Sequence, residues 1–396
     1  MAERNGRIRC LEFFSGIGGL HYGFQESQVD GEVVMSFDMN ENANRVYEHN
    51  FRMRPNNKAI DYLVPRDIER HDANCWLLSP PCQPYTRGGK YLDDEDPRAR
   101  GLVHLLELLP KLDKVPSYLF LENVMNFENS RSRRLAVETL GHLGFEIHEC
   151  LISPVQLGIP NNRLRYFLIA CRRWPAPSSR PGDGDSGTTE AWLAENKKRT
   201  AEYLARGRDS MAGVEIPKIP LAQYIDPAQN GDRALWVPER AIMKRKNLEF
   251  DIVRPLDTQT STFTKAYGSK HLIGSGSLLQ TKNLDVVENG FGSPEKLLDL
   301  GLRFFSPKEV ALLHHFPFHN PHPTSDDGDA GKEEEEKGGA SAKRARHARY
   351  MLEFPTGITQ QQQLKLLGNS LNVKVVAELL KHILFAEPPV ETSNKQ

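Results

Sequence analysis

Short apolar runs rich in β-branched and aromatic residues recur along the first part of the chain. Five of them predict strands: IRCLEFF (8–14), EVVMSFD (32–38), CWLLS (75–79), YLFLE (118–122) and RYFLIA (165–170). Between them, apolar residues return every three or four positions, which predicts helices over 41–51, 102–112 and 131–145. Strands with little internal alternation, separated by helices, are typical of a parallel sheet covered on both faces. The pattern predicts a doubly wound, mostly parallel α/β domain over 7–173.

The pattern changes after Trp174. The stretch PAPSSRPGDGDSGTTE predicts a linker or surface insertion, and no regular alternation of strands and helices follows it. We therefore expect a smaller second domain over 174–300 and a return to the first domain over 301–390. A charged stretch over 324–349 predicts a disordered loop within that return. Its KRARHAR sequence would be a nuclear signal or a solvated charge run, and the second interpretation is favoured.

Composition excludes several classes of protein. The 396 residues are 39% hydrophobic, enough for a substantial core, and no apolar run is long enough to predict a signal peptide or membrane span. The five cysteines form no C-x-x-C, so neither a disulfide framework nor a zinc site is indicated. Because the formal net charge is −1, binding of nucleic acid would require a local basic face. We expect a cytoplasmic or nuclear protein.

A glycine-rich stretch, FFSGIGG, follows the first predicted strand and leads into a helix. Gly16, Gly18 and Gly19 would clear space for a ligand close to the backbone. Asp38, at the end of the next strand, would accept hydrogen bonds from both hydroxyls of a ribose. Together they predict a site for an adenosine-containing cofactor, with a tight turn beside an unrelated carboxylate as the alternative. The third glycine of the dinucleotide fingerprint is missing, which favours S-adenosylmethionine over a dinucleotide.

Cys82 lies in the stretch SPPCQPYTRGG, directly after a predicted strand. Three prolines fix φ and donate no N–H, so the loop should leave the sheet in a stiff, extended form. It would do so at the carboxyl ends of the strands, where α/β sheets bind ligands. A small buried cysteine is the ordinary alternative. The neighbouring Arg87 and the glycines of a plausible hinge favour a nucleophilic thiolate instead.

Further polar residues stand where predicted strands end or begin. Glu122 ends YLFLE at the same sheet edge as the cysteine, although a strand-end glutamate can also cap a helix. Arg163 and Arg165 alternate in NNRLRYF and should point to one face, unless they are solvated edge charges. In LLGNSLNV, Asn369 and Ser370 interrupt an apolar helical pattern, either as a helix N-cap or as ligand contacts.

Taken together, PPCQ, ENV and RLR occur in the order typical of cytosine-5 methyltransferases. The chain resembles that family over 10–173 and again over 302–384. SPPCQPYTRGG, LGIPNNRLRYFLIA, TFTKAYGS and LRFFSPKEVALL resemble its tRNA-aspartate branch, formerly classed as a second type of DNA methyltransferase. The resemblance implies a class I S-adenosylmethionine-dependent methyltransferase fold, with a target-recognition domain over 174–300. It also implies methylation at C5 of cytosine-38 in the anticodon loop of tRNA-Asp.

The resemblance implies a role for each catalytic residue. Cys82 would add to C6 of the cytosine and so make C5 nucleophilic. A protonated Glu122 would supply a hydrogen bond or proton at N3. Arg163 and Arg165 would hold the cytosine O2 and steady the Cys82 loop. No metal is expected, because the sulfonium of the cofactor already makes the methyl group electrophilic.

The resemblance also implies a pocket for S-adenosylmethionine built from the ends of several strands. Its expected members are Phe14 against the adenine; Gly16, Ile17, Gly18 and Gly19 along the methionine part; Asp38 at the ribose; Ile60 and Asp61 flanking the adenine; and Ser79, Asn369 and Ser370 lining the pocket.

The chain departs from the pattern of that branch at a few positions. Thr262 stands where the branch usually has the cysteine of Cys-Phe-Thr, Asn161 where the wider family often has Gln, and Tyr85 where Phe is common. The acidic residues 333–336 have no counterpart in the pattern. None of these changes touches the core chemistry.

Three rival functions share parts of this pattern: a DNA cytosine-5 methyltransferase, a nicotinamide-dependent oxidoreductase and an inactive nucleic-acid-binding relative. The intact catalytic residues argue against the last two. We favour tRNA because a loop base costs less to unstack than a paired one. A monomer with one basic face, formed by Arg87, Lys265, Lys270 and Lys374, would suffice for recognition of folded RNA.

Overall fold

The structure is a computed structural model that describes residues 7–85, 93–172, 218–244, 250–269, 273–286, 293–318 and 351–385. Three predicted features lie outside these residues: the linker that follows Trp174, the charged loop with its KRARHAR sequence, and two members of the predicted basic face, Arg87 and Lys270.

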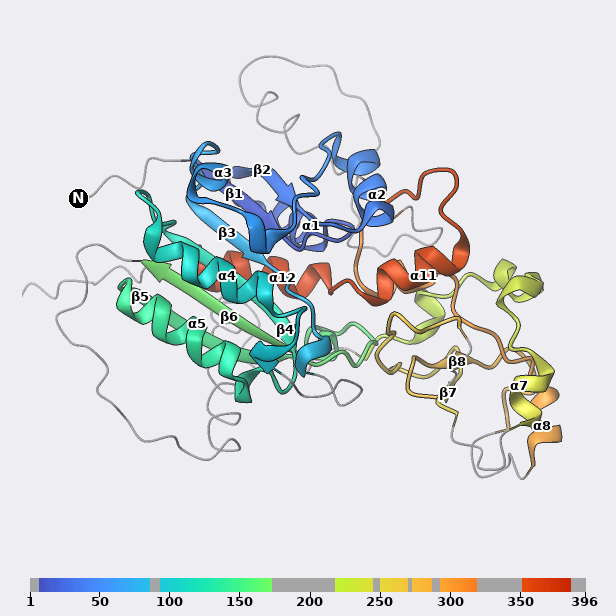
Figure 1. The fold of residues 1–396 in the computed structure, drawn as a ribbon. Helices are drawn as coiled ribbons and strands as arrows, with labels where there is room; N and C mark the ends of the chain where they lie inside the picture. The colour runs from blue at the N-terminus through green and yellow to red at the C-terminus, as the bar shows by residue number, and fades with distance from the viewer. Residues whose placement is uncertain are drawn as a thin grey trace, which may run out of the picture.

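A six-stranded sheet forms the centre of the molecule (Figure 1). Its strands are β1 (Ile8–Phe13), β2 (Gly31–Phe37), β3 (Cys75–Leu78), β4 (Tyr118–Val124), β5 (Phe145–Ile152) and β6 (Arg165–Arg172). They are ordered β2-β1-β3-β4-β6-β5. The first four run parallel, and β6 is antiparallel to both of its neighbours. The prediction of a mostly parallel sheet is confirmed.

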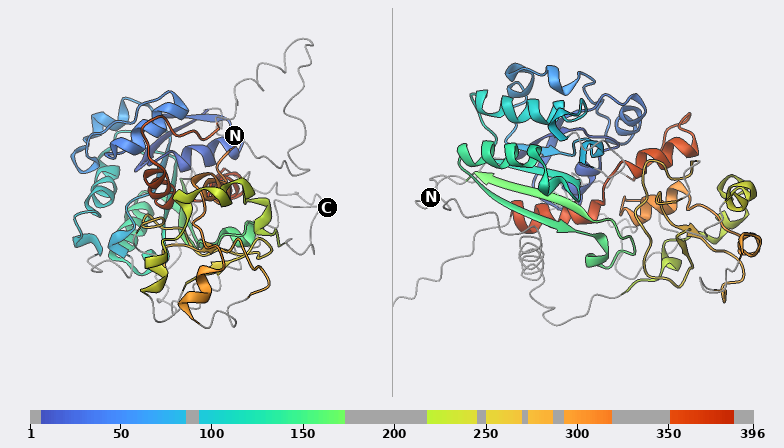
Figure 2. Two further views of the ribbon diagram at one scale, coloured as in Figure 1. Left: turned by 90° about the vertical axis from the view of Figure 1, so that its right-hand side faces the viewer. Right: turned by 60° about the horizontal axis from the view of Figure 1, so that its bottom comes forward.

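Helices cover both faces of this sheet (Figure 2). They are α1 (Gly19–Glu26), α2 (Glu41–Phe51), α3 (Pro65–Glu69), α4 (Arg100–Leu108), α5 (Arg131–His142) and α12 (Val373–Leu379). Buried residues of α3, α4 and α5 form one hydrophobic cluster with one face of the sheet, and those of α1 and α12 form another with the opposite face. Successive strand residues alternate between the faces, so both positions are apolar in a sheet covered on both sides.

The apolar runs predicted five of the six strands, and β5 was missed. The helix predicted over 131–145 ends earlier, at His142, because Gly144 adopts a left-handed φ of 79° and turns the chain. The chain then enters β5, FEIHECLI, where Glu146, His148 and Glu149 interrupt the apolar run. These polar residues are tolerated because β5 lies at the edge of the sheet.

The second lobe holds short elements joined by three-ten turns, as its irregular pattern suggested. It contains α7 (Glu239–Met243), β7 (Ile252–Val253), β8 (Leu278–Leu279) and α8 (Pro294–Leu298). Its buried residues share a hydrophobic cluster with α2 and with the return helices α9 (Pro307–Leu313) and α11 (Gln360–Gly368). Backbone hydrogen bonds from Val237 to Leu302 and from Phe304 to Leu235 continue past residue 300. The domain boundary at 300 stays a prediction.

Capping residues divide the C-terminal return into separate helices. Helix α9 begins at Pro307 because the Ser306 hydroxyl accepts a hydrogen bond from the Glu309 N–H. The periodic stretch over 363–385 is interrupted after α11, and Asn372 caps α12 by accepting from the Val375 N–H at 3.1 Å. A π-helical turn, 380–384, follows α12.

Candidate active site and cofactor pocket

The loop between β1 and α1 has an unusual backbone. Phe14 adopts a φ of 58°, which is rare for a residue other than glycine, and Gly16 adopts 53°. A Cβ atom on Gly16 would meet no atom of the described residues within 4 Å, so this glycine borders open space in that part of the structure. Beside it, the buried hydroxyl of Ser15 has no hydrogen-bond partner within the described structure. This part of the loop is shaped to receive a ligand.

The other two loop glycines serve internal packing. A Cβ on Gly18 would stand 2.3 Å from the Phe51 ring, and one on Gly19 would stand 2.9 Å from Leu371 and from the Ser370 hydroxyl. The missing side chains of these glycines leave room for α2 and for the chain after α11. Their expected contact with the methionine part of the cofactor stays a prediction. The sequence could not distinguish a glycine that makes room for a ligand from one that makes room for a neighbouring segment, because either role requires the absence of a side chain.

Asp38 ties the loop to the end of β2. Its carboxylate accepts hydrogen bonds from the backbone N–H of Gly16, at 2.8 Å, and of Asn40, at 2.7 Å. Burial raises the pKa of this carboxyl, and the backbone hydrogen bonds oppose the rise. Both oxygens are therefore held in a fixed orientation at the edge of the loop.

The residues expected around an adenine lie close together. A Cβ on Gly101, in α4, would stand 3.1 Å from the Phe14 ring and 3.5 Å from Ile60. Asp61 follows in the same short helix, 60–62, and is partly exposed. Gly101 was not singled out in the sequence, because nothing local shows that α4 meets the loop after β1.

Two chain segments complete this pocket. Ser79, after β3, donates its hydroxyl to the Phe14 carbonyl at 3.0 Å and its N–H to the Phe13 carbonyl at 3.2 Å. Asn369 ends α11 as its C-cap, and so is not the helix N-cap that was the alternative interpretation. Ser370 follows it against Gly19. Phe14, Asp38 and Ser79 thus directly follow the carboxyl ends of the parallel strands β1, β2 and β3.

Cys82 lies on a loop that is held at both sides. Before it, the Pro80 carbonyl accepts a hydrogen bond from the Asn123 side chain at 3.3 Å. After it, the Cys82 carbonyl accepts from the Tyr85 N–H, and the Tyr85 hydroxyl donates to Ser132 in α5 at 2.9 Å. The thiol itself is partly exposed and free. Asn123 and Ser132 were not predicted, since only the fold brings them to this loop.

Glu122 is buried beside Arg165. The Arg165 Nε lies 3.4 Å from a Glu122 carboxylate oxygen, and Glu122 is 9% exposed. Burial raises the pKa of Glu122, and the charges of Arg165 and Arg163 partly oppose this. Asn123, which holds the Cys82 loop, is the next residue of β4, so one hydrogen bond joins the strand of Glu122 to the loop of Cys82. The protonated Glu122 carboxyl can donate a hydrogen bond.

Arg163 has partners that the sequence did not reveal. Its guanidinium is buried and donates to the carbonyls of Phe263 (2.8 Å), Gly368 (3.4 Å) and Ser370. Burial and the neighbouring Arg165 lower its pKa to about 9. Arg163 thus joins the start of β6 to the second lobe and to Ser370, and it also interacts electrostatically with Glu122 and Cys82. Its expected role at the cytosine O2 and at the Cys82 loop stays a prediction. Arg165 remains beside Glu122.

The residues that depart from the family pattern make structural contacts. The Asn161 side-chain amide donates to the Thr260 hydroxyl and to the Ser261 carbonyl, both at 3.0 Å. The Thr262 hydroxyl donates to the Asn162 carbonyl at 2.8 Å. These bonds fasten the segment before β6 to the second lobe, which explains why polar residues are retained there.

The predicted basic face is weaker than expected in its described part. Lys374 pairs with Glu378 at 2.8 Å along α12, so much of its charge is neutralised. Lys265 is exposed next to the position where α11 ends. The face as a whole stays a prediction.

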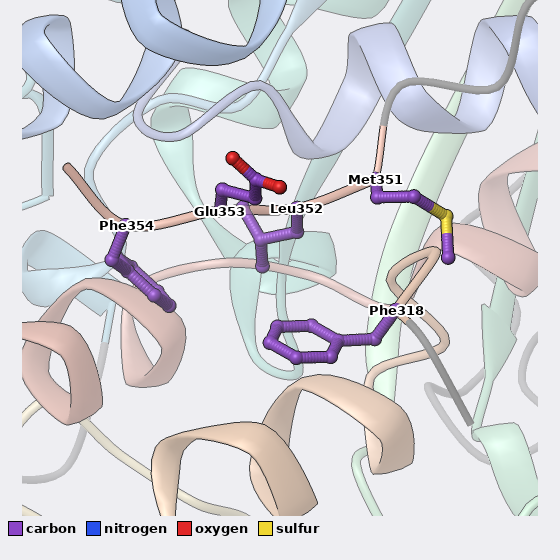
Figure 3. Close-up of a pocket in the computed structure, with 5 residues that line it drawn as sticks. All are labelled: Phe318, Met351, Leu352, Glu353 and Phe354. Atoms are coloured by element: carbon purple, nitrogen blue, oxygen red, sulfur yellow. The ribbon is translucent and has the colours of Figure 1, made fainter. Parts of the chain in front are cut away.

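A separate cavity of about 310 Å³ lies between Phe318 and the segment 351–354. Leu352 and Phe318 face each other across it, and Glu353 lies nearby (Figure 3). The lining contains none of the predicted site residues, so this cavity is distinct from the candidate active site.

Metal ligands and membrane-spanning helices can be assessed for the part of the chain that the structure describes. There, no group of three or more His, Cys, Asp or Glu side chains is arranged to hold a metal ion. No helix in the same ranges is long and apolar enough to cross a membrane.

Comparisons with known proteins agree on one family. The profile described as C-5 cytosine-specific DNA methylase matches residues 8–330. The chain is 35% identical to the tRNA (cytosine(38)-C(5))-methyltransferase of Bos taurus, over 94% of this chain and 98% of the bovine protein. It is 34% identical to a DNA (cytosine-5)-methyltransferase of Dictyostelium discoideum, over 95% of this chain and 94% of that protein.

A solved structure supports the same assignment. The Entamoeba histolytica methyltransferase EhMeth superposes with a TM-score of 0.71 at 27% identity, covering 96% of this chain and 98% of that one. The fold is accordingly that of class I S-adenosylmethionine-dependent methyltransferases. The chain belongs to the C-5 cytosine-specific DNA methylase family and is an enzyme of that family.

Proposed function

We propose that this enzyme methylates C5 of a cytosine in tRNA, with cytosine-38 in the anticodon loop of tRNA-Asp as its target. The observation that carries the proposal is the hydrogen bond from Asn123 to Pro80, which joins the loop of Cys82 to the strand of Glu122. Near full-length similarity to the bovine tRNA enzyme supports the choice of substrate. The cytoplasm and the nucleus are the expected compartments.

The loop after β1 fits S-adenosylmethionine. Among the described residues, Gly16 borders open space next to the Ser15 hydroxyl, which has no partner there, and Asp38 presents an oriented carboxylate at the end of β2. Phe14 and Ile60 would contact the adenine, and Asp38 would accept from the ribose. When bound, the cofactor supplies an electrophilic methyl group on a sulfonium. No resident metal is invoked.

The catalytic residues would act in sequence on the base. The Cys82 thiolate forms a bond to C6, while Glu122 donates a hydrogen bond or proton to N3. Bonding of sulfur to C6 would displace the C5–C6 π pair and make C5 an enamine carbon, which could take the methyl group that bound S-adenosylmethionine would supply, with a neutral thioether as the leaving group. A base removes the C5 proton, the C5–H bonding pair restores the C5–C6 double bond, and Cys82 leaves C6 as thiolate. Arg165, beside Glu122, would contact the cytosine O2.

The Arg163 contacts support a positioning role in this mechanism. Its guanidinium joins the pocket segment at Ser370 to the second lobe at Phe263. The cofactor pocket and the second lobe are therefore held together beside the proposed position of the target cytosine. We assign Arg163 to this linkage.

A DNA cytosine is the second candidate substrate, because the Dictyostelium relative carries that name at similar identity. The target base must leave its stack to reach Cys82. Unstacking costs a few kcal/mol in a duplex and less in an unpaired loop. This difference favours the anticodon loop.

Labelled methyl transfer to tRNA-Asp and to duplex DNA, at equal concentrations of cytosine, tests the proposal. We expect at least tenfold faster methylation of the tRNA, and no signal once its cytosine-38 is replaced by uracil. Faster methylation of the duplex would reverse the choice of substrate.

Cys82→Ala tests the nucleophile in the same assay. It should abolish turnover and leave cofactor binding nearly intact, because the thiol lies on a loop outside the core. Cys171→Ala is the matched control and should retain activity, because Cys171 lies near the end of β6 that is distant from Arg165. Turnover of the Cys82 variant above a hundredth of wild type would refute the assignment.

A further inference from the structure

Three buried polar side chains lie beneath the loop that joins β1 to α1. Glu12 and Tyr47 are fully buried, and His21 is 9% exposed. One Glu12 carboxylate oxygen accepts the backbone N–H of His21 at 3.2 Å, and the other accepts the Tyr47 hydroxyl at 2.8 Å. The Tyr47 oxygen also lies 2.8 Å from His21 Nδ1. None of the proposed catalytic steps uses this cluster.

The chain can satisfy this cluster in two protonation states. With Glu12 ionised, the Tyr47 hydroxyl donates to the carboxylate and His21 Nδ1–H donates to Tyr47. With Glu12 protonated, its O–H donates to the Tyr47 oxygen, and the Tyr47 hydroxyl donates to His21 Nδ1, whose own proton has moved to Nε2 in the other neutral tautomer. His21 stays neutral in both states, since burial lowers its pKa to about 3. A proton can therefore be gained or lost without leaving a buried polar atom unpaired.

The charges around Glu12 do not favour its ionised form. Its pKa is raised to about 8, because burial, together with the charge of Asp38, outweighs the hydrogen bonds from Tyr47 and from two backbone N–H groups that lower it. The remaining titratable groups facing it are His21 and Cys10, of which the first is neutral and the second is a buried thiol. No cation is among the described groups that act on it. A cation bound at the loop would therefore add a positive charge that none of these groups supplies to Glu12.

Glu12 is placed to sense such a cation. Its strand leads directly into the cofactor loop, and its carboxyl binds the first turn of the helix that follows the loop. Asp38, which acts on Glu12, holds the middle of the same loop through Gly16. S-Adenosylmethionine carries a positive sulfonium, whereas the demethylated product is a neutral thioether.

We propose that Glu12 is a positioning residue that responds to the charge of the bound cofactor: it releases its proton to solvent when the sulfonium form binds and keeps that proton when the neutral thioether product is bound. The inference rests on the proposed function, because it needs S-adenosylmethionine as the ligand. Its consequence is discrimination between substrate and product at a site where both share every atom except the transferred methyl group.

The expected pH dependence follows from linkage. A nearby cation lowers the pKa of Glu12, so binding of the sulfonium cofactor releases a proton and tightens as pH rises through that pKa. Binding of the neutral thioether brings no cation to Glu12, so its affinity does not rise with pH in this way. A shift of one pKa unit corresponds to a tenfold change in affinity. The ratio of the two dissociation constants, product over cofactor, should rise about tenfold between pH 6.5 and pH 9.

Isothermal titration calorimetry with the purified full chain measures this ratio. Titrating both ligands in two buffers of different ionisation enthalpy also counts protons at each pH. We expect more proton release with S-adenosylmethionine than with S-adenosylhomocysteine near pH 7.5. Taking the ratio cancels most of the titration of the ligands' amino groups, which both molecules carry. This measurement needs no variant.

Two variants test the assignment to Glu12. Glu12→Gln should make the affinity ratio independent of pH, and Tyr47→Phe should move its rise to higher pH, since the Tyr47 hydrogen bond lowers the pKa of Glu12. Glu128→Gln is the control, a partly buried carboxyl with raised pKa outside the pocket, and it should leave the ratio unchanged.

The possible failures are distinguishable. If the wild type binds S-adenosylmethionine but shows a flat ratio and equal proton release for both ligands, the charge-sensing role is wrong and the proposed function stands. If it binds neither ligand at any pH, the proposed function fails, and this inference fails with it.

Discussion

At the scale of single residues, Glu122 has the environment of a group that holds a proton. It is buried, and its raised pKa reflects burial more than the attraction of Arg165 at 3.4 Å. If the protonated form acts at N3, turnover should fall as pH rises through this pKa. Glu122→Gln keeps a hydrogen-bond donor but cannot transfer a proton, so turnover should drop by about 10²–10⁴-fold and lose the alkaline decline.

Steady-state turnover measured as a function of pH, from the ordinary carboxyl pKa upward, tests this expectation. Glu128→Gln is a suitable control, because burial raises the pKa of that carboxyl too, outside the candidate site. If the alkaline decline survived unchanged in the Glu122 variant, another group would have to hold the proton.

At the scale of elements, Arg163 joins three parts of the fold. Its guanidinium donates to carbonyls in the second lobe, at the end of α11 and in the pocket segment. Lysine keeps the charge but lacks the planar fork that reaches several acceptors. Arg163→Lys should therefore leave buried carbonyls unpaired and lower the free energy of unfolding by about 2 kcal/mol or more.

Urea unfolding of the two variants Arg163→Lys and Arg172→Lys makes the comparison. Arg172 ends the same strand and is partly exposed, so its replacement should cost less than about 0.5 kcal/mol. Equal stability of both variants would show that the Arg163 contacts contribute little to the fold.

Local patterns predicted those parts of the fold and site that depend on one segment. Apolar runs identify strands that are buried on both faces, and the ends of those strands point to Asp38 and Glu122. They could not predict the partners of Arg163, which lie about 100 and 200 residues away in the chain. Nor could they show that Gly18 makes room for Phe51. Such roles exist only once distant segments meet.

At the scale of the whole molecule, three buried groups set opposing slopes in the dependence of stability on pH. Burial lowers the pKa of His21 to about 3 and that of His314 well below its usual value. Both histidines therefore contribute stability that is present above about pH 6.5, the unfolded value, and is lost as pH falls. Glu12 has the opposite sign, since its folded pKa of about 8 lies above its unfolded value. Its contribution is lost as pH rises.

These signs place the maximum stability from these three groups near pH 6.5. Below it, the unfolded state binds two more protons on the histidines, which outweighs the one that Glu12 retains in the folded state. Above it, Glu12 alone of the three lowers the free energy of unfolding, by about 2 kcal/mol between pH 6.5 and pH 8.

Urea unfolding of the cofactor-free protein at pH 5, 6.5 and 8 should show this maximum. Glu12→Gln should flatten the alkaline side while the acid side persists, because the histidines remain. A variant with an unchanged alkaline decline would show that the Glu12 carboxyl is already ionised in the folded protein at neutral pH.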